Sequence, residues 1–222
     1  MKKIVLISSI AILASSTAFA DGPAKSGLLF EGQLSANVTP KNTFQSVQDN
    51  SPYNNVLGSE IDNGGLGGGL YLGYDYALNN NMTIGVLSGY QYIYQLNKLE
   101  VNQALGNVST GNDKLNVNSI PVLATFKYFF NSGWLVGGEG GLDVQKWVVS
   151  GNNAYSGESD SNWNVAPMVG AFGGYQWNNG LALTGDLSYV FGKTTDNLES
   201  LSKNSALAFY TVGIDLSYKL PM

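Results

Sequence analysis

The chain has 222 residues, with eleven lysines against sixteen acidic residues, a formal net charge of −5, and no Arg, His or Cys. An acidic chain without arginine is a poor partner for nucleic acid, because phosphate contacts and base readout depend on basic side chains. The absence of Cys excludes disulfides and thiolate metal sites, and the absence of His removes the commonest general base and metal ligand. Only 12% of the residues are charged, whereas Gly (28) and Tyr (13) are abundant, which favours strands and turns.

Residues 1–20 have the pattern of a cleaved secretory signal peptide. Lys2 and Lys3 precede an apolar run over residues 4–13, and Ala18-Phe19-Ala20 offers a cleavage site with small residues at both ends. No later window approaches the roughly 20 apolar residues of a spanning helix. We therefore expect a signal peptide over 1–20 and one domain over 21–222 that does not enter a membrane by helices.

Apolar and polar residues then alternate with a period of two along eight segments. In the first of them, Leu28, Phe30 and Leu34 share one parity, whereas Glu31 and Gln33 share the other. The segments cover residues 28–39, 66–78, 82–95, 118–130, 134–147, 163–177, 181–192 and 206–220. A strand that crosses a bilayer needs about 9–11 residues, whereas soluble strands average about 5–6. These segments have the length of spanning strands.

The connections alternate in length. Three are short and rich in Asn and Gly, residues that tolerate positive φ in tight hairpin turns: 79–81, 131–133 and 178–180. Four are long and polar: 40–65, 97–117, 148–162 and 193–205. This rhythm predicts that all tight turns lie at one end of the molecule and all long loops at the other.

Charges within the segments avoid the apolar parity. Those on the opposite parity are Glu31, Asp75, Lys127, Glu139, Asp143, Asp186, Asp215 and Lys219. Lys146 is the exception, at the loop end of its segment, and Leu123, Phe129 and Phe172 fall on the polar parity. A charge on a lipid-facing position costs a few kcal/mol, and only helices and closed barrels satisfy the backbone in hydrocarbon. The pattern predicts an all-β, eight-stranded antiparallel up-and-down transmembrane β-barrel.

The inward charges predict a polar plug centred on Lys127, because the interior of an eight-stranded barrel has room only for side chains. Lys127 and Glu139 flank one hairpin and are expected to pair diagonally. The six acids outnumber the two lysines, so some carboxyl groups would be solvated, protonated or held by Tyr and Ser. Acid–base catalysis by paired carboxylates is the less favoured interpretation. The glycines of residues 64–69 are interpreted as room for bulky neighbours rather than as a dinucleotide fingerprint, which needs a following helix.

Aromatic residues gather toward both ends of the segments, which predicts two interfacial girdles. Near the turns or the C-terminus lie Tyr74, Tyr76, Tyr128, Phe130, Trp134, Tyr175, Trp177 and Tyr218. Toward the loops lie Tyr90, Tyr92, Tyr94, Tyr189, Phe191 and Tyr210. The alternative is that aromatics simply favour strands.

With these features, residues 28–220 resemble the eight-stranded OmpA-type and surface-antigen barrels of Gram-negative outer membranes. The resemblance implies periplasmic turns, extracellular loops, surrounding outer-membrane lipid and insertion by the barrel-assembly machinery. The last strand departs from the family, which usually ends in an outward aromatic residue where this chain has Met222 after Pro221. Barrel enzymes of similar size depend on His, which is absent, so no enzymatic activity and no cofactor are expected.

The sequence thus predicts a non-enzymatic surface protein of the outer membrane. A rigid scaffold commonly binds through its loops, so loops 40–65, 97–117, 148–162 and 193–205 are candidates for adhesion or for a host or surface ligand. A narrow, porin-like channel for ions or small solutes is one alternative. Another is a soluble periplasmic barrel that encloses an apolar ligand, in which the apolar parity would face inward. No catalytic, cofactor-binding or metal-binding residue is predicted.

Overall fold

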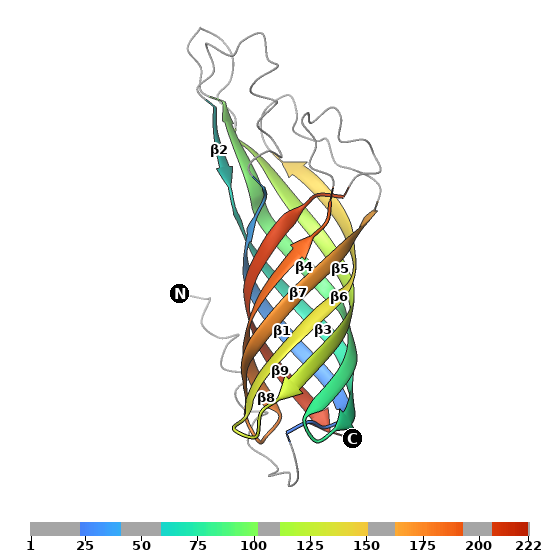
Figure 1. Cartoon of the computed structure of the whole chain (residues 1–222). Coiled ribbons are helices and arrows are strands. Elements are labelled where there is room, and N and C mark those ends of the chain that lie inside the picture. Colours follow the sequence, from blue (N-terminus) through green and yellow to red (C-terminus); the bar gives the residue numbers. More distant parts are fainter. Residues whose placement is uncertain (1–22, 41–58, 102–111, 151–162, 193–205, 222) are drawn as a thin grey trace, which may run out of the picture.

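The computed structural model describes residues 23–40, 59–101, 112–150, 163–192 and 206–221, which form a barrel of tilted strands (Figure 1). The strands are β1 (Gly27–Val38), β2 (Ser59–Asn63), β3 (Gly65–Asn79), β4 (Met82–Val101), β5 (Asn112–Phe129), β6 (Trp134–Ser150), β7 (Asn164–Gln176), β8 (Leu181–Val190) and β9 (Phe209–Pro221). The expected signal peptide and loop 193–205 lie outside the described residues. No helix in the described part of the chain has the length and apolarity needed to span a membrane.

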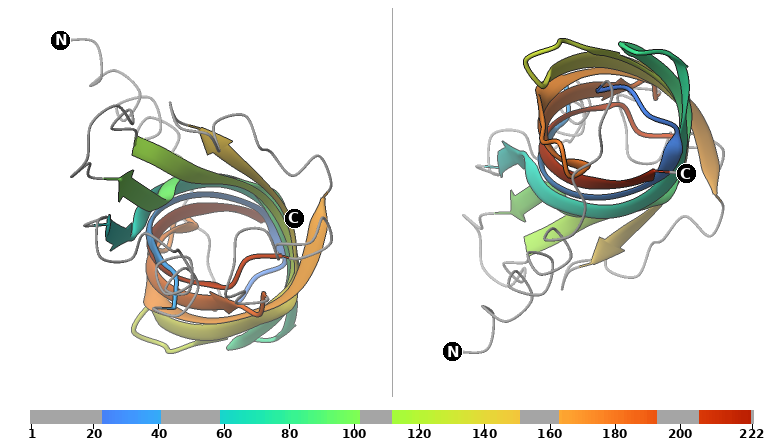
Figure 2. Two further views of the ribbon diagram at one scale, coloured as in Figure 1. Left: turned by 90° about the horizontal axis from the view of Figure 1, so that it is seen from above. Right: turned by 90° about the horizontal axis from the view of Figure 1, so that it is seen from below.

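All strand pairs are antiparallel, and the sheet closes on itself. The sheet order runs β2-β4-β3-β1-β9-β8-β7-β6-β5, and β4 also pairs with β5, which completes the ring seen end-on in Figure 2. The first and last barrel strands meet, with Leu28 opposite Leu220. The short strand β2 pairs with β4 in the same register as β3 does, because Asn63 lies opposite Asn97 and Leu66 lies opposite Tyr94. Setting aside β2 as a continuation of β3, the barrel has the eight up-and-down strands that the alternation predicts.

Parts of the expected loops are strand, which corrects the predicted bounds. Loop 40–65 contains β2 and the start of β3, and loop 97–117 contains the end of β4 and the first residues of β5. Strand β6 likewise runs to Ser150, into the expected loop 148–162. These strands extend the sheet above one side of the ring (Figure 1). Backbone pairing between neighbouring strands continues the sheet there.

A bulge separates this extension from the barrel proper. The register between β4 and β5 shifts between Ile93 and Asn97, where Gln95 has a φ of 57°. The backbone N–H of Gln95 donates to Oδ1 of Asn116 at 2.9 Å, which satisfies a donor that the ladder leaves unpaired. Bulges bend a strand and increase its local twist. The bulge therefore marks where β4 leaves the curvature of the barrel.

The three tight turns follow the predicted chemistry. Gly133 and Gly180 have φ values of 88° and 85°, which glycine adopts without steric cost. The N–H of Gly133 donates to the carbonyl oxygen of Phe130, and that of Gly180 to the carbonyl oxygen of Trp177, both at 3.0 Å. In the first turn, the N–H of Asn81 donates to Oδ1 of Asn79.

The side chains are oriented as in a membrane barrel. Leu34, Leu66 and Leu70 are 74%, 73% and 75% exposed on the outside, whereas Asp75 and Asp143 are each 1% exposed inside. A water-soluble protein rarely exposes a continuous apolar belt around its whole circumference. This orientation is the reverse of what a soluble barrel with an apolar interior requires, so that alternative is wrong.

The interior is not polar throughout. At the turn end, Phe129, Leu135, Ala182 and Ala24 form an apolar cluster with Phe172 packed against it. The loop-side part of the interior is also apolar, with a second cluster that includes Ile93, Leu96, Leu115, Val117, Trp147, Leu207 and Phe209. Apolar residues on the inward parity thus fill both ends of the barrel interior. The sequence predicts a polar interior, and the structure corrects that prediction. Strand β9 also begins three residues later than predicted, because residues 206–208 are buried without strand pairing.

Candidate functional site in the barrel interior

A buried ion cluster formed by Asp75, Lys127 and Lys219 crosses the lumen near the turn end. Strand β3 supplies the carboxylate, and β5 and β9, on opposite sides of β3, supply the two ammonium groups. Oδ2 of Asp75 lies 3.0 Å from Nζ of Lys127 and 2.7 Å from Nζ of Lys219. The Lys219 ammonium also lies 5.1 Å from the ring centroid of Phe129. Paired charges of this kind are the condition for burying ions in a narrow interior.

A glycine explains why Lys127 pairs with Asp75. Strand β4 lies between β3 and β5, and a Cβ at Gly85 would be 2.5 Å from Oδ1 of Asp75 and 2.8 Å from Oγ1 of Thr125. The missing side chain lets the carboxylate cover β4 and reach the lysine. The expected diagonal pair of Lys127 with Glu139 is therefore corrected, since the described ion pairs of both interior lysines go to Asp75.

Four carboxyl groups line a cavity of about 40 Å³ in the middle of the barrel: Glu31, Glu139, Asp186 and Asp215. Both lysines of the ion cluster line the same cavity. Oδ2 of Asp186 and Oδ1 of Asp215 are buried and have no protein hydrogen-bond partner. A cavity of this volume has room for about three water molecules, and buried waters satisfy such atoms. The cavity is therefore expected to be hydrated.

An amide network centred on Gln33 organises the cavity wall. Nε2 of Gln33 donates to Oδ1 of Asp186 at 3.3 Å, and its Oε1 accepts hydrogen bonds from the Tyr71 hydroxyl and from Nε2 of Gln91, both at 3.0 Å. On the neighbouring strands, Oγ1 of Thr184 donates to Oδ2 of Asp215 at 3.3 Å. Asp186 and Asp215 therefore accept hydrogen bonds from neutral side chains and not from lysines.

Glycines make room for the bulky member of this network. A Cβ at Gly69 would lie 2.7 Å from the Tyr71 ring, and one at Gly89 would lie 2.6 Å from it. Strand glycines with this role leave space inside a narrow barrel. The glycine-rich segment 64–69 accordingly continues into strand β3 and not into a helix.

Glutamine 145 closes the loop side of the interior. Its side-chain amide donates to the carbonyl oxygen of Leu207 at 3.3 Å and accepts from the N–H of Leu207 at 3.0 Å. Leu207 itself is fully buried. Nε2 of Gln145 also donates to Asp143, which accepts a hydrogen bond from Ser119. Asp143 is thus held by neutral partners, separately from the ion cluster.

Taken together, the interior has three closing layers along the axis. An apolar cluster and the ion cluster lie between the cavity and the turns, and the loop-side apolar cluster lies above the cavity. Among the described residues, no group of acidic side chains has the geometry to hold a metal ion. The arrangement of these side chains supports closure of the lumen and no particular reaction. Of the eight residues predicted for the plug, the structure joins three directly, places four around the cavity, and places Asp143 above them.

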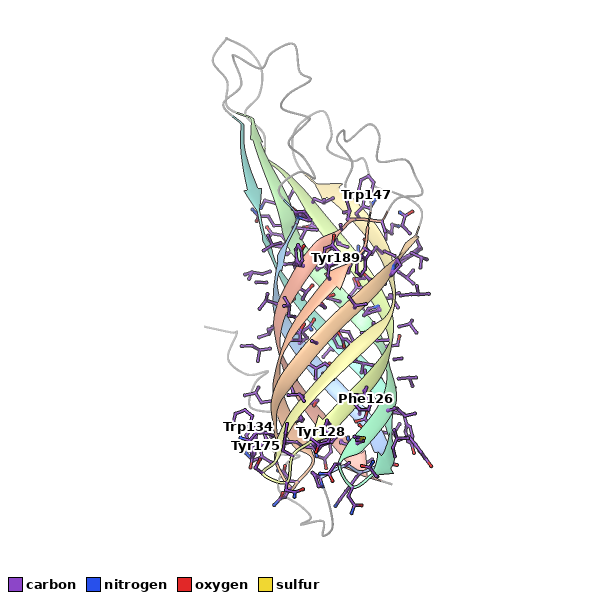
Figure 3. The ribbon with its side chains drawn as sticks, in the orientation of Figure 1. Phe126, Tyr128, Trp134, Trp147, Tyr175 and Tyr189 are labelled. Atoms are coloured by element: carbon purple, nitrogen blue, oxygen red, sulfur yellow. The ribbon has the colours of Figure 1, made fainter. Side chains whose placement is uncertain are left out.

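The aromatic residues predicted as girdles lie on the outside of the barrel. Ten of them are more than a third exposed: Tyr74, Tyr76, Tyr90, Tyr92, Tyr94, Phe130, Trp134, Trp177, Phe191 and Tyr210. The others, Tyr128, Tyr175, Tyr189 and Tyr218, are half-buried. Trp134, Tyr175 and Tyr128 lie at the turn end, whereas Tyr189 lies toward the loop end (Figure 3). Edge-to-face contacts join Trp134 to Tyr175 and Tyr175 to Trp177. Their insertion at the two membrane interfaces stays a prediction.

The sequence did not single out Tyr71, Gln91 or Leu207. Tyr71 and Gln91 lie on the inward parity of their segments, and that parity is the signal that could have identified them. Leu207 carries no such signal, because its burial depends on a contact with Gln145 that is 62 residues away.

No protein-family model matches the chain, and no curated protein sequence is similar to it. Among solved structures, it is similar to Ail, the attachment invasion locus protein of Yersinia pestis in complex with the heparin analogue sucrose octasulfate, at 14% identity and a TM-score of 0.49, covering 88% of this chain and 99% of that one. It is also similar to Neisserial surface protein A (12%, TM-score 0.49, 89% and 100% covered). A third similar structure is the outer membrane protein OprG from Pseudomonas aeruginosa (12%, TM-score 0.44, 90% and 100% covered). The fold assignment itself follows from the strand pairing and side-chain orientation given above.

Proposed function

We propose that the chain is a non-enzymatic structural and surface protein of the Gram-negative outer membrane, with a closed lumen and with loops that serve interaction. The observation that carries the proposal is the inversion of polarity: an apolar belt outside and ionisable side chains inside. In a bilayer this arrangement places the apolar surface in hydrocarbon, and the closed sheet provides hydrogen-bond partners for the backbone N–H and C=O groups of every barrel strand. Surrounding lipid and the barrel-assembly machinery are the partners that such a location requires.

The interaction role is proposed for the end opposite the tight turns. The strand ends that flank the long connections, among them Val38 and Ser59, and Ser150 and Asn164, lie at that end (Figure 1). Loops on a rigid barrel are free to vary without disturbing the closed sheet. A ligand for adhesion would therefore meet residues 40–65, 97–117, 148–162 or 193–205.

Fractionation tests the membrane placement. We expect the protein to stay with the outer membrane after a carbonate wash and to migrate differently on gels before and after boiling. Recovery in the soluble periplasmic fraction would overturn the proposal. Protease treatment of intact cells tests the orientation, with cleavage expected within 40–65 or 148–162 and none in the turn 79–81. Cleavage at that turn on intact cells would reverse the assignment of the two ends.

A narrow channel is the second candidate, and the acid-lined cavity is the observation that favours it. Planar-bilayer recording separates the two functions. The closed lumen predicts no steady single-channel conductance, whereas a reproducible open level selective for cations would favour the channel.

A further inference from the structure

Two charged side chains among the described residues of the barrel strands face outward, and both lie on one side of the barrel. Of the barrel-strand side chains that the structure describes, Lys114 on β5 and Lys146 on β6 are the charged ones on the outward parity. The described acids on these strands lie on the inward parity. Strands β5 and β6 are adjacent, and both lysines lie in their loop-side halves. The outer surface thus carries a local positive charge with no described acid to neutralise it.

A tyrosine on the neighbouring strand fixes the Lys114 ammonium. Nζ of Lys114 donates to the hydroxyl of Tyr94 at 2.8 Å and lies 5.2 Å from the centroid of the same ring. Tyr94 is 45% exposed on the outside of β4. A cation above an aromatic face is attracted by the ring, so the ammonium is held at the level of the aromatic side chains. It can still donate to a further acceptor, because an ammonium has three N–H groups.

Asn118 lies between the two lysines along the outer surface, four residues after Lys114 on β5 and opposite Lys146 on β6. The hydroxyl of Tyr90 donates to Oδ1 of Asn118 at 2.5 Å, and the register places Asn118 directly opposite Lys146. Nδ2 of Asn118 donates weakly to the backbone carbonyl of Lys146 at 3.5 Å. Tyr90, Tyr94, Lys114, Asn118 and Lys146 lie on three adjacent strands and are here called the basic patch.

Apolar residues continue the same outer surface below the basic patch. Val122 on β5 and Leu142 on β6 lie opposite each other and are 53% and 50% exposed. Ile120 and Val144, also paired, lie between them and the basic patch. The surface therefore has donors and positive charge at the loop side and a hydrocarbon face toward the midplane, which matches a lipid with an anionic head and acyl tails.

We propose that the basic patch binds the phosphate group of lipids in the loop-side leaflet. Lysine and tyrosine supply charge-assisted and neutral donors to phosphate oxygens, and no described acid on the outer surface opposes the anion. Basic residues at a membrane surface attract anionic lipids by about 1 kcal/mol each, which is roughly five-fold in affinity per lysine. The inference rests on the proposed membrane placement, because in solution these side chains would simply be hydrated.

Native mass spectrometry of the folded full chain, titrated with phosphatidic acid, tests the proposal. Diacylglycerol with the same acyl chains serves as the lipid without phosphate. We expect the first phosphatidic acid to bind more tightly than diacylglycerol, and K114Q/K146Q to weaken only phosphatidic acid, by about 25-fold. K114R/K146R should retain binding. K25Q removes one positive charge at the turn end, as each single variant K114Q or K146Q does in the basic patch, and should leave binding unchanged. Inorganic phosphate at millimolar concentration should not displace the lipid, which separates a lipid site from a site for free phosphate.

Several outcomes would overturn the inference: equal binding of the two lipids by the wild-type chain, equal loss in K25Q, or displacement by inorganic phosphate. The single variants K114Q and K146Q are measured as well, so that the result does not depend on folding of the double variant. Folding is scored separately by heat-modifiable gel mobility in phosphatidylcholine. A chain that inserts but does not discriminate phosphate contradicts only the basic patch, whereas a chain that does not insert contradicts the membrane placement.

Discussion

Replacing Asp75 with asparagine keeps the shape of the side chain but removes the anion of the ion cluster. Lys127 and Lys219, at 3.0 and 2.7 Å from the carboxylate, would then lose the one anion that both of them contact directly, and the side chains of Asp75 and Lys219 are at most 4% exposed. Removing one partner of a buried ion pair costs about 3–5 kcal/mol, and we expect a loss of unfolding free energy in that range.

Urea unfolding in lipid vesicles, followed by tryptophan fluorescence, measures this loss. Asp143→Asn is the matched control, because Asp143 is equally buried but is held by Ser119 and Gln145, neutral partners. Its cost should be about 1 kcal/mol. Replacing the whole cluster by apolar residues, D75L/K127M/K219M, should restore much of the stability, because an apolar cluster of similar volume removes the buried charges. Equal losses in D75N and D143N would refute the argument that the ion cluster holds the turn end together.

Three further perturbations follow from the same geometry. Gly85→Ala should destabilise the barrel by about 1–3 kcal/mol, because the new Cβ would lie 2.5 Å from a carboxylate oxygen. Gly138→Ala should be neutral, because the nearest neighbour of its Cβ would be at 3.6 Å. Equal effects of the two variants in urea unfolding would contradict this argument. Gln145→Ala leaves the buried backbone of Leu207 without two hydrogen bonds, so amide exchange at residues 206–209 should accelerate while that of the turn-end strands does not. Leu70→Lys, at a position 75% exposed to the outside, should destabilise the folded barrel in bilayers by up to about 2–4 kcal/mol, and an unchanged stability would argue against lipid contact there.

The alternation of side chains predicts the barrel well, because one physical cause, the bilayer, acts on every strand. Eight strands, three tight turns and the direction of each interior charge follow from period two and from residues such as Gly133 and Gly180. Strand length was harder to predict. β4 continues past the bulge at Gln95 and pairs with β2, within the long polar connections that the sequence predicts as loops.

The contacts inside the barrel were predicted less well. Lys127 was assigned to Glu139 because the two lie on paired strands, but the absence of a side chain at Gly85 lets it reach Asp75 across β4. The loop-side closure was not predicted either. It depends on Leu207 entering the lumen and meeting Gln145, and a contact between residues so far apart in the chain leaves no periodic signal.

The absence of cysteine from the chain permits a direct measurement of orientation. Single cysteines placed in turn along β9, from Thr211 to Leu216, would carry spin labels whose collisions with oxygen and with a water-soluble nickel complex are compared in bilayers. We predict that Val212, Ile214 and Leu216 favour oxygen, as lipid-facing sites do, and that Thr211 and Asp215, at 2% and 4% exposed, are shielded from lipid. The opposite parity, or no alternation, would contradict the assignment of the apolar face to lipid.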